Sequence, residues 1–228
     1  MKSIAILQSN YIPWKGYFDV IKSVDAFVIY DEVQYTKNDW RNRNMIKTAT
    51  GPAWMTIPVR QLSLSQKIFE TEVSQANWNV KHWNTIKTNY SKAGSYGEYG
   101  PVFEKIYKEI TTPNLSEINL TFIKAINSVL NINTEIVDSR DLKLEGDKNE
   151  RLIDAIKKLN GDRYLSGPAA QSYLDVARFH EEGIQVDWID YSGYQEYDQL
   201  YPPFVHGVSA LDLIFNMGAE APDYLKVK

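Results

Sequence analysis

Short apolar runs alternate with helical patterns along this chain, and their order predicts a parallel α/β sheet. Residues 4–7 form a continuous apolar run typical of a buried strand, and the apolar spacing over 14–24 predicts the helix that follows. Residues 25–30 are rich in β-forming side chains and predict a second strand. A third strand is expected over 54–59, where Pro58 indicates a strand end or a sheet edge.

The second half of the chain continues this alternation. Strands are predicted over 134–138, 163–166 and 184–190, with helical patterns between them. Strand–helix–strand units at this spacing imply parallel pairing through right-handed crossovers. We therefore expect a single α/β domain over 1–228, built on a mostly parallel, doubly wound sheet.

The middle of the chain is predicted to be helical. Glycines and prolines interrupt the pattern, but Phe103, Ile106 and Ile110 fit one helical face. We interpret residues 79–131 as a helical insertion within the domain. After the last predicted strand, an aromatic and polar loop leads into a final helix over 209–216.

The composition narrows the classes of function. A net charge of −4 argues against a protein that binds duplex nucleic acid, because such proteins usually carry a basic surface. The absence of cysteine excludes disulfides, thiolate metal sites and a cysteine nucleophile. No signal-peptide pattern is present, and no apolar run approaches the roughly 18 residues of a membrane span. We therefore expect a cytoplasmic protein without a membrane span.

The motif content favours a binding surface over a metal centre. The three histidines have no metal-ligand spacing, so no metal site is expected, and the sequence assigns no cofactor. The common P-loop, dinucleotide and hydrolase fingerprints are absent. Many of the 15 tyrosines and 6 tryptophans stand beside polar residues, a mixture that suits binding surfaces, including those that stack on sugars.

Polar residues and turns follow the first two predicted strands. The first group could be a surface turn with helix-capping residues or a ligand-binding turn, and it consists of Gln8, Asn10, Pro13 and Gly16. The second group could be a solvated loop, or an anion-binding loop because arginine binds anions bidentately. It consists of Asp31, Gln34, Arg41, Asn42, Arg43 and Asn44. Because parallel strands end at one sheet edge, we favour binding for the second group.

Further candidates follow the later strands. Turns after parallel strands can leave backbone N–H groups open to a phosphate, and the residues at these turns are Ser139, Lys148, Ser166 and Gly167. His206 precedes the last predicted helix. Packing is the simpler interpretation of His206, but we keep it as a candidate acid or base.

Several stretches of the chain resemble the WbqC-like protein family. They are 6–8 with Pro13, 16–18, 27–31, 33–35, 40–44, 164–167 and 209–212. Members of that family are encoded with enzymes of bacterial O-antigen (lipopolysaccharide) and other surface-polysaccharide biosynthesis, often in amino-sugar pathways. The resemblance implies this setting and does not fix a reaction.

A more distant likeness concerns the fold. The order of the elements, with Tyr-Leu-Ser-Gly over 164–167, is similar to the nucleotidyltransferase-like, or Rossmann-like, fold, of which pantothenate synthetase is one example. In that fold a His-x-Gly-His turn contacts the phosphates of ATP. The matching stretch, 13–17, keeps Gly16 and lacks both histidines, which argues against adenylyl transfer.

The function we favour from the sequence is a transferase that modifies a nucleotide-linked amino sugar by acyl transfer to its amine. The acyl donor stays open, and an activated thioester would need no protein nucleophile. The residues assigned are Arg41 and Arg43 for the pyrophosphate or a carboxylate, Gln8, Asn42 and Asn44 for the sugar hydroxyls, Tyr11 or Trp14 for ring stacking, and Asp31 or His206 for the amine proton.

Two alternatives remain from the sequence. One is an ATP-dependent nucleotidyltransferase or ligase of the same fold, in which Lys15 and Lys148 replace the missing histidines at the phosphates. The other is a non-catalytic protein that binds a sugar nucleotide, because no nucleophile–base pair is recognisable. The oligomeric state stays open, with a homodimer as one option.

Overall fold

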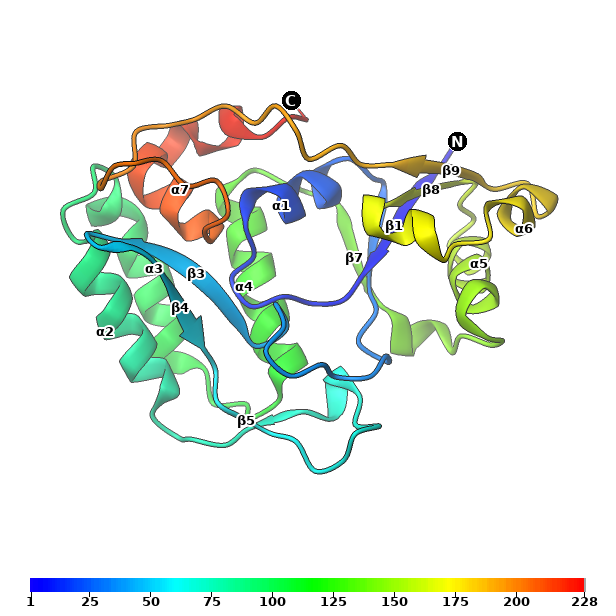
Figure 1. The fold of residues 1–228 in the computed structure, drawn as a ribbon, viewed down its shortest axis with the longest axis horizontal. Helices are drawn as coiled ribbons and strands as arrows, with labels where there is room; N and C mark the ends of the chain where they lie inside the picture. Colours follow the sequence, from blue (N-terminus) through cyan, green and yellow to red (C-terminus); the bar gives the residue numbers. More distant parts are fainter. Residues whose placement is uncertain (228) are drawn as a thin grey trace.

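A five-stranded parallel sheet forms the centre of the protein (Figure 1), whose computed structural model describes residues 1–227. The strand order is β7-β2-β1-β8-β9, and every neighbouring pair is parallel. The strands are β1 (Ser3–Leu7), β2 (Ala26–Ile29), β7 (Glu135–Asp138), β8 (Arg163–Ser166) and β9 (Gln185–Trp188). The predicted parallel α/β sheet is confirmed, with strand ends within a few residues of those expected.

Alternate residues of the central strands enter two different hydrophobic clusters. Ala5 and Phe27 belong to the larger cluster, which contains the buried side chains of the N-terminal and middle helices. Their neighbours Ile4 and Val28 belong to a second cluster with the helices after β7 and β8. Both faces of the sheet are therefore covered, as the continuous apolar runs of β1 and β2 require.

The described chain contains seven α-helices. They are α1 (Lys15–Lys22), α2 (Trp78–Tyr90), α3 (Tyr96–Glu109), α4 (Leu115–Val129), α5 (Lys148–Lys158), α6 (Val176–Glu181) and α7 (Ala210–Met217). Helices α2, α3 and α4 occupy the stretch interpreted as an insertion, and all three contribute to the larger cluster. Four short 3₁₀ helices are η1 (Ile68–Glu70), η2 (Ser139–Leu142), η3 (Pro168–Ser172) and η4 (Gly218–Tyr224). Within residues 1–227, no helix combines the length and the apolar character that a membrane crossing needs.

The strand expected over 54–59 is wrong in its bounds. Strand β4 (Gly51–Thr56) pairs antiparallel with β3 (Arg43–Thr48) in a hairpin outside the main sheet, seen at the left of Figure 1. Pro58 has no N–H to donate, and it separates β4 from β5 (Val59–Arg60), which pairs with β6 (Glu72–Val73). Arg43 and Asn44, expected in a loop at the sheet edge, are therefore strand residues of the hairpin.

Candidate functional site

A cavity of about 500 Å³ lies at the carboxyl edge of the sheet, between β1 and β8. The chain after β1 enters α1 on one face of the sheet, whereas the chain after β8 continues to α6 on the other. Such a reversal leaves a crevice in which open α/β folds bind ligands. We call it the switch cavity; its lining comprises Ile6, Leu7, Gln8, Tyr30, Val33, Lys148, Asn149, Leu152, Tyr164, Ser166, Gly167, Ala169, Ala170, Tyr173 and Leu174.

The walls of the switch cavity are mainly apolar and aromatic. The phenol of Tyr30 accepts a hydrogen bond from Arg151 Nε at 2.9 Å, and Arg151 also pairs with Glu32 at 3.0 Å. Burial raises the pKa of Tyr164 to about 12, so its hydroxyl is a protonated donor at neutral pH. Tyr173 stands at the rim with 69% of its surface exposed. Aromatic and apolar walls of this kind suit a planar or partly apolar ligand.

The polar end of the switch cavity is the start of α5. The Asp147 side chain caps the helix by accepting from the N–H of Glu150, and Lys148 and Asn149 in the first turn line the cavity. The N-terminus of a helix attracts anions through its free N–H groups and its dipole. A ligand with an apolar ring and a phosphate therefore fits both ends of this cavity.

Four predicted site residues meet in the switch cavity. Gln8 follows β1, Ser166 ends β8, Gly167 follows it, and Lys148 begins α5. Their assignment to one edge rested on parallel pairing, which the register shows. Their role in binding stays a prediction.

Other predicted residues line a second hollow of about 310 Å³. Its walls are Asn10, Trp14, Trp40, Asn44 and Gly207. The Asn44 amide nitrogen donates to the carbonyls of Tyr11 and Ile12 at 3.2 and 3.0 Å. Its oxygen accepts from the N–H of Met45, at 2.8 Å. The amide of Asn44 therefore holds the backbone, rather than facing a ligand with free atoms.

Asp31, the proposed base, is almost fully buried, with 2% of its surface exposed. Its carboxylate accepts from the N–H of Ser9 at 2.8 Å, from Ser9 Oγ at 2.6 Å and from Ser116 Oγ. Burial raises the pKa of this carboxyl, and the hydrogen bonds from Ser116 and Ser9 oppose the shift. The arrangement ties β1 and β2 to α4, so a structural role explains Asp31; its role as a base stays untested.

Tyr11 and Gly16 also have structural surroundings. Tyr11 is buried, and its hydroxyl contacts His82 Nδ1 at 2.8 Å and the hydroxyl of Tyr107. A Cβ on Gly16 would lie 2.3 Å from Trp14 Cζ2, so the glycine allows the indole to lie over it. Tyr11 and Gly16 therefore contribute to the packing of the turn after β1. Tyr11 has no exposed ring surface on which a sugar could stack.

The remaining candidates are spread over the molecule. Gln34 donates to the carbonyl of Leu64, and Ser139 is buried after the edge strand β7. Arg41 binds Asn10 and Asp39, and Asn42 and Arg43 belong to the hairpin region described below. His206 is exposed and packs edge-on against Phe204 at 4.6 Å, outside the lining of the switch cavity.

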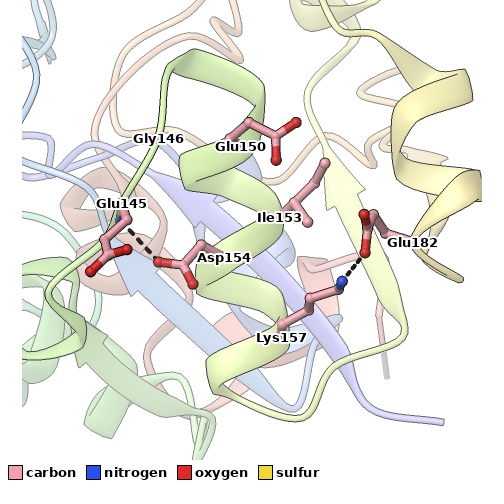
Figure 2. A pocket seen from close by; sticks show the side chains of 7 residues that line it. All are labelled: Glu145, Gly146, Glu150, Ile153, Asp154, Lys157 and Glu182. Atoms are coloured by element: carbon pink, nitrogen blue, oxygen red, sulfur yellow. Dashed lines mark hydrogen bonds and ion pairs between the residues drawn. The ribbon is translucent and has the colours of Figure 1, made fainter.

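Figure 2 shows a further hollow, of about 310 Å³, beside α5. Three of its carboxylates are already engaged: Asp154 accepts from the N–H of Glu145 at 3.0 Å, Glu182 pairs with Lys157, and Glu150 pairs with Arg178. No group of three or more potential metal ligands occurs in the part of the chain that is described. This hollow is therefore a network of surface ion pairs.

Sequence reasoning missed several residues of the switch cavity. The sequence places Tyr30 and Tyr164 in predicted strands and in stretches of family resemblance, without a binding role, and it does not mark Asn149 or Tyr173. The available signal was the position of Tyr30 immediately before Asp31 at the end of β2, and the start of a capped helix at Asp147. Tyr173 carries no local signal, because its place depends on how η3 folds back over the sheet edge.

Comparisons with known proteins confirm the resemblance seen in the sequence. The family model described as "WbqC-like protein family" matches residues 8–224. Rv1507c, an uncharacterized protein of Mycobacterium tuberculosis, is 48% identical over 227 residues, which are 99% of this chain and 98% of that protein. No solved structure matches the chain. The chain belongs to the WbqC-like protein family.

Proposed function

We propose that this protein binds a nucleotide-linked amino sugar in the switch cavity and modifies it during surface-polysaccharide biosynthesis. The family is linked to polysaccharide biosynthesis. The single observation that carries the proposal is the cavity of about 500 Å³ at the reversal of strand connections, with aromatic walls and the start of α5 at one end. Nucleotides bind at this place in folds that share the strand order.

In this proposal, the two ends of the cavity hold different parts of the ligand. The rings of Tyr30 and Tyr164 contact the base or the sugar, and Lys148 with the first-turn N–H groups of α5 binds the phosphates. Gln8 and Ser166 supply hydrogen bonds to hydroxyl groups. The nucleotidyltransferase-like assignment of the fold is part of the same proposal, supported by the strand order.

The reaction we propose is acyl transfer to the sugar amine. The amine nitrogen forms a bond to the acyl carbon, the bond from that carbon to the sulfur of a thioester donor breaks, and the thiolate leaves with the proton that the amine loses. Positioning of donor and amine can lower the barrier of such a reaction by about 7–11 kcal/mol. Asp31 and His206 remain the predicted proton acceptors, although neither lines the switch cavity.

One observation favours a second candidate, a binding protein without catalysis. Among the described residues that line the switch cavity there is no aspartate, glutamate or histidine. The ATP-dependent alternative is weakened by Lys15, whose ammonium donates to the carbonyl of Gln195 at 2.8 Å between the rings of Tyr194 and Tyr197. Burial lowers the pKa of Lys15 to about 8, and the side chain is not free for phosphates.

Ligand titration tests the proposed function. Calorimetry with UDP-, dTDP- and GDP-linked amino sugars, ATP and acyl-CoA should give binding of a nucleotide sugar that Lys148→Ala weakens about tenfold, the value of one charge-assisted hydrogen bond. Lys158→Ala, at the other end of α5, is the matched control and should keep the affinity. Binding without acyl transfer would favour the non-catalytic candidate, and no binding of any nucleotide sugar would refute the proposal.

A further inference from the structure

The hollow of about 310 Å³ beside the turn after β1 has no part in the proposed function. We call it the indole hollow; it is lined by Asn10, Trp14, Trp40, Asn44 and Gly207. None of these residues lines the switch cavity. Trp14 is partly exposed and Trp40 is 41% exposed, although tryptophan is highly buried on average. The hollow therefore presents indole surface to solvent.

Two residues of the indole hollow carry polar groups that are free for a ligand. Arg41 donates to Asn10 Oδ1, and this bond leaves Asn10 Nδ2 as a donor that has no acceptor among residues 1–227. The backbone N–H and carbonyl of Gly207 also have no hydrogen bond in the described part of the chain. Both residues are partly exposed. Donors and an acceptor thus stand beside the indoles, as a ligand with hydroxyl groups requires.

The aromatic surface continues from the indole hollow onto the β3–β4 hairpin. The ring centroid of Trp54 lies 5.3 Å from that of Trp40, and Trp54 is 47% exposed. On the neighbouring strand, the guanidinium carbon of Arg43 lies 4.2 Å from the centroid of the Trp54 ring. A guanidinium held against an exposed indole places a positive charge at the edge of this surface.

The charge of Arg43 is available to an anion. Within residues 1–227 the guanidinium forms no ion pair, whereas Arg41 pairs with Asp39 and Arg151 pairs with Glu32. Its Nε is buried, but the two terminal nitrogens, which lack hydrogen bonds in this stretch as well, are not among the buried atoms. An accessible guanidinium binds a carboxylate through charge-assisted hydrogen bonds.

The hairpin that carries Arg43 and Trp54 is anchored where its strands begin and end. Asn42 Nδ2 donates to the carbonyl of Ile57 at 2.8 Å, and the N–H of Ile57 donates to the carbonyl of Asn42 at 2.7 Å. The hydroxyl of Tyr35 and Oδ1 of Asn42 have no partner in the chain as described, but both atoms are closed off from solvent and take no part in the site. A fixed strand pair presents the ring and the charge with little ordering left for a ligand to impose.

We propose that the indole hollow and the adjoining Trp54–Arg43 surface bind an acidic saccharide. One sugar ring stacks its C–H face on an indole, and its hydroxyls bond the free groups of Asn10 and Gly207. A carboxylate on this ring or the next accepts from the terminal nitrogens of Arg43. An acyl chain in the same place would cover these polar groups without pairing them, at a cost. The site needs no nucleotide, so it is independent of the function proposed for the switch cavity.

Tryptophan indole signals in ¹H–¹⁵N spectra of the full chain test this proposal. The probes are a disaccharide of glucuronate and N-acetylglucosamine and its neutral counterpart, N,N′-diacetylchitobiose. Trp40→Phe and Trp54→Phe assign two of the six indole peaks. The acidic disaccharide should shift both peaks, and the neutral one should bind more weakly. Butyryl-pantetheine, which carries an acyl chain and no sugar, is the competing probe, and a response to it alone would overturn the saccharide assignment.

Variants on the two sides of the surface separate stacking from charge recognition. Trp40→Ala removes an indole face and should weaken binding of the acidic disaccharide about tenfold. Trp54→Ala should do the same, and its exposed ring makes it the second measure of stacking should Trp40→Ala fail to fold. Arg43→Gln should weaken binding of the acidic disaccharide about tenfold and leave the affinity for the neutral one unchanged.

Tyr173→Ala, at the rim of the switch cavity, is the matched control and should keep both affinities. If this control loses the saccharide as Trp40→Ala does, the saccharide binds in the switch cavity and the proposed site is refuted. The proposal also fails if neither disaccharide shifts the two indole peaks, or if Arg43→Gln binds the acidic disaccharide as the wild type does. None of these results bears on whether a nucleotide sugar binds in the switch cavity, which the calorimetry described above decides.

Discussion

Replacing Asp31 separates a structural role from a catalytic one. The carboxylate holds three donors: the Ser9 N–H, Ser9 Oγ and Ser116 Oγ. It joins the turn after β1, through Ser9, to the first turn of α4, through Ser116, which is 85 residues away from Asp31 along the chain. If this tie is the function of Asp31, its removal must appear first in the free energy of unfolding.

The size of the effect follows from these contacts. A buried donor without an acceptor costs about 1–3 kcal/mol. The N–H of Ser9 is fixed, whereas the two hydroxyls can rotate toward other acceptors, so we expect Asp31→Ala to lose about 3–5 kcal/mol in total. Asp31→Asn keeps one acceptor for the N–H and offers an amide to the hydroxyls, so it should lose only about 1–2 kcal/mol.

Urea unfolding followed by circular dichroism at pH 7 measures both variants. The expected signature is a lower midpoint with an unchanged slope, and a larger loss for alanine than for asparagine. An exposed carboxylate, in the control Asp223→Ala, should change stability by less than about 0.5 kcal/mol. If Asp31→Ala is as stable as the wild type while the enzyme loses turnover, the tie is refuted and the catalytic role is restored.

Two further predictions concern the core near the turn after β1. Burial lowers the pKa of His82 to about 4, against an ordinary value near 6.5. Only the unfolded state takes up this proton below pH 6.5, so the stabilisation is complete above pH 6.5. It falls by about 3 kcal/mol as the pH drops to 4. Urea unfolding at pH 7.5 and 4.5 should show this loss, and His82→Gln should reduce it; equal losses would contradict the assignment. Gly16→Ala should cost about 1–3 kcal/mol, because the new Cβ displaces the Trp14 indole. The control Gly97→Ala meets open space, and equal stability of the two variants would contradict the packing argument.

The main sheet could be predicted because its signals are local. Strands buried on both faces read as continuous apolar runs, and β2 is buried at every position. The helix start at Asp147 carries its own cap, and the Asp147 side chain indeed accepts from Glu150 N–H. Hairpin strand β3 lacks such a signal, because Asn44 and Lys47 are polar and yet buried. The N–H of Lys47 finds its partner in the hydroxyl of Tyr90, at 2.8 Å, far along the chain.

The candidate site could be predicted only to the level of the sheet edge. Parallel strands bring Gln8, Ser166 and Gly167 to one place, which needs no knowledge of side-chain direction. Asp31 lies at the same edge, but its carboxylate points toward α4, where it accepts a hydrogen bond from Ser116. The sequence gives no signal for this contact. The unpaired buried atoms of Tyr35 and Asn42 could not be predicted from the sequence either, because the groups that surround them are set by the three-dimensional fold.

The turn after β1 connects the switch cavity to the β3–β4 hairpin. Gln8 lines the switch cavity, whereas the N–H of Tyr11 donates to the carbonyl of Trp40 at 3.0 Å. Ile12 between them has a φ of 36°, a strained value for a β-branched residue, and the Asn44 amide holds its carbonyl at 3.0 Å. Strain of this kind persists only where the surroundings fix it. The hairpin, although it lies outside the main sheet, therefore fixes the shape of the turn after β1, whose first residue, Gln8, lines the switch cavity.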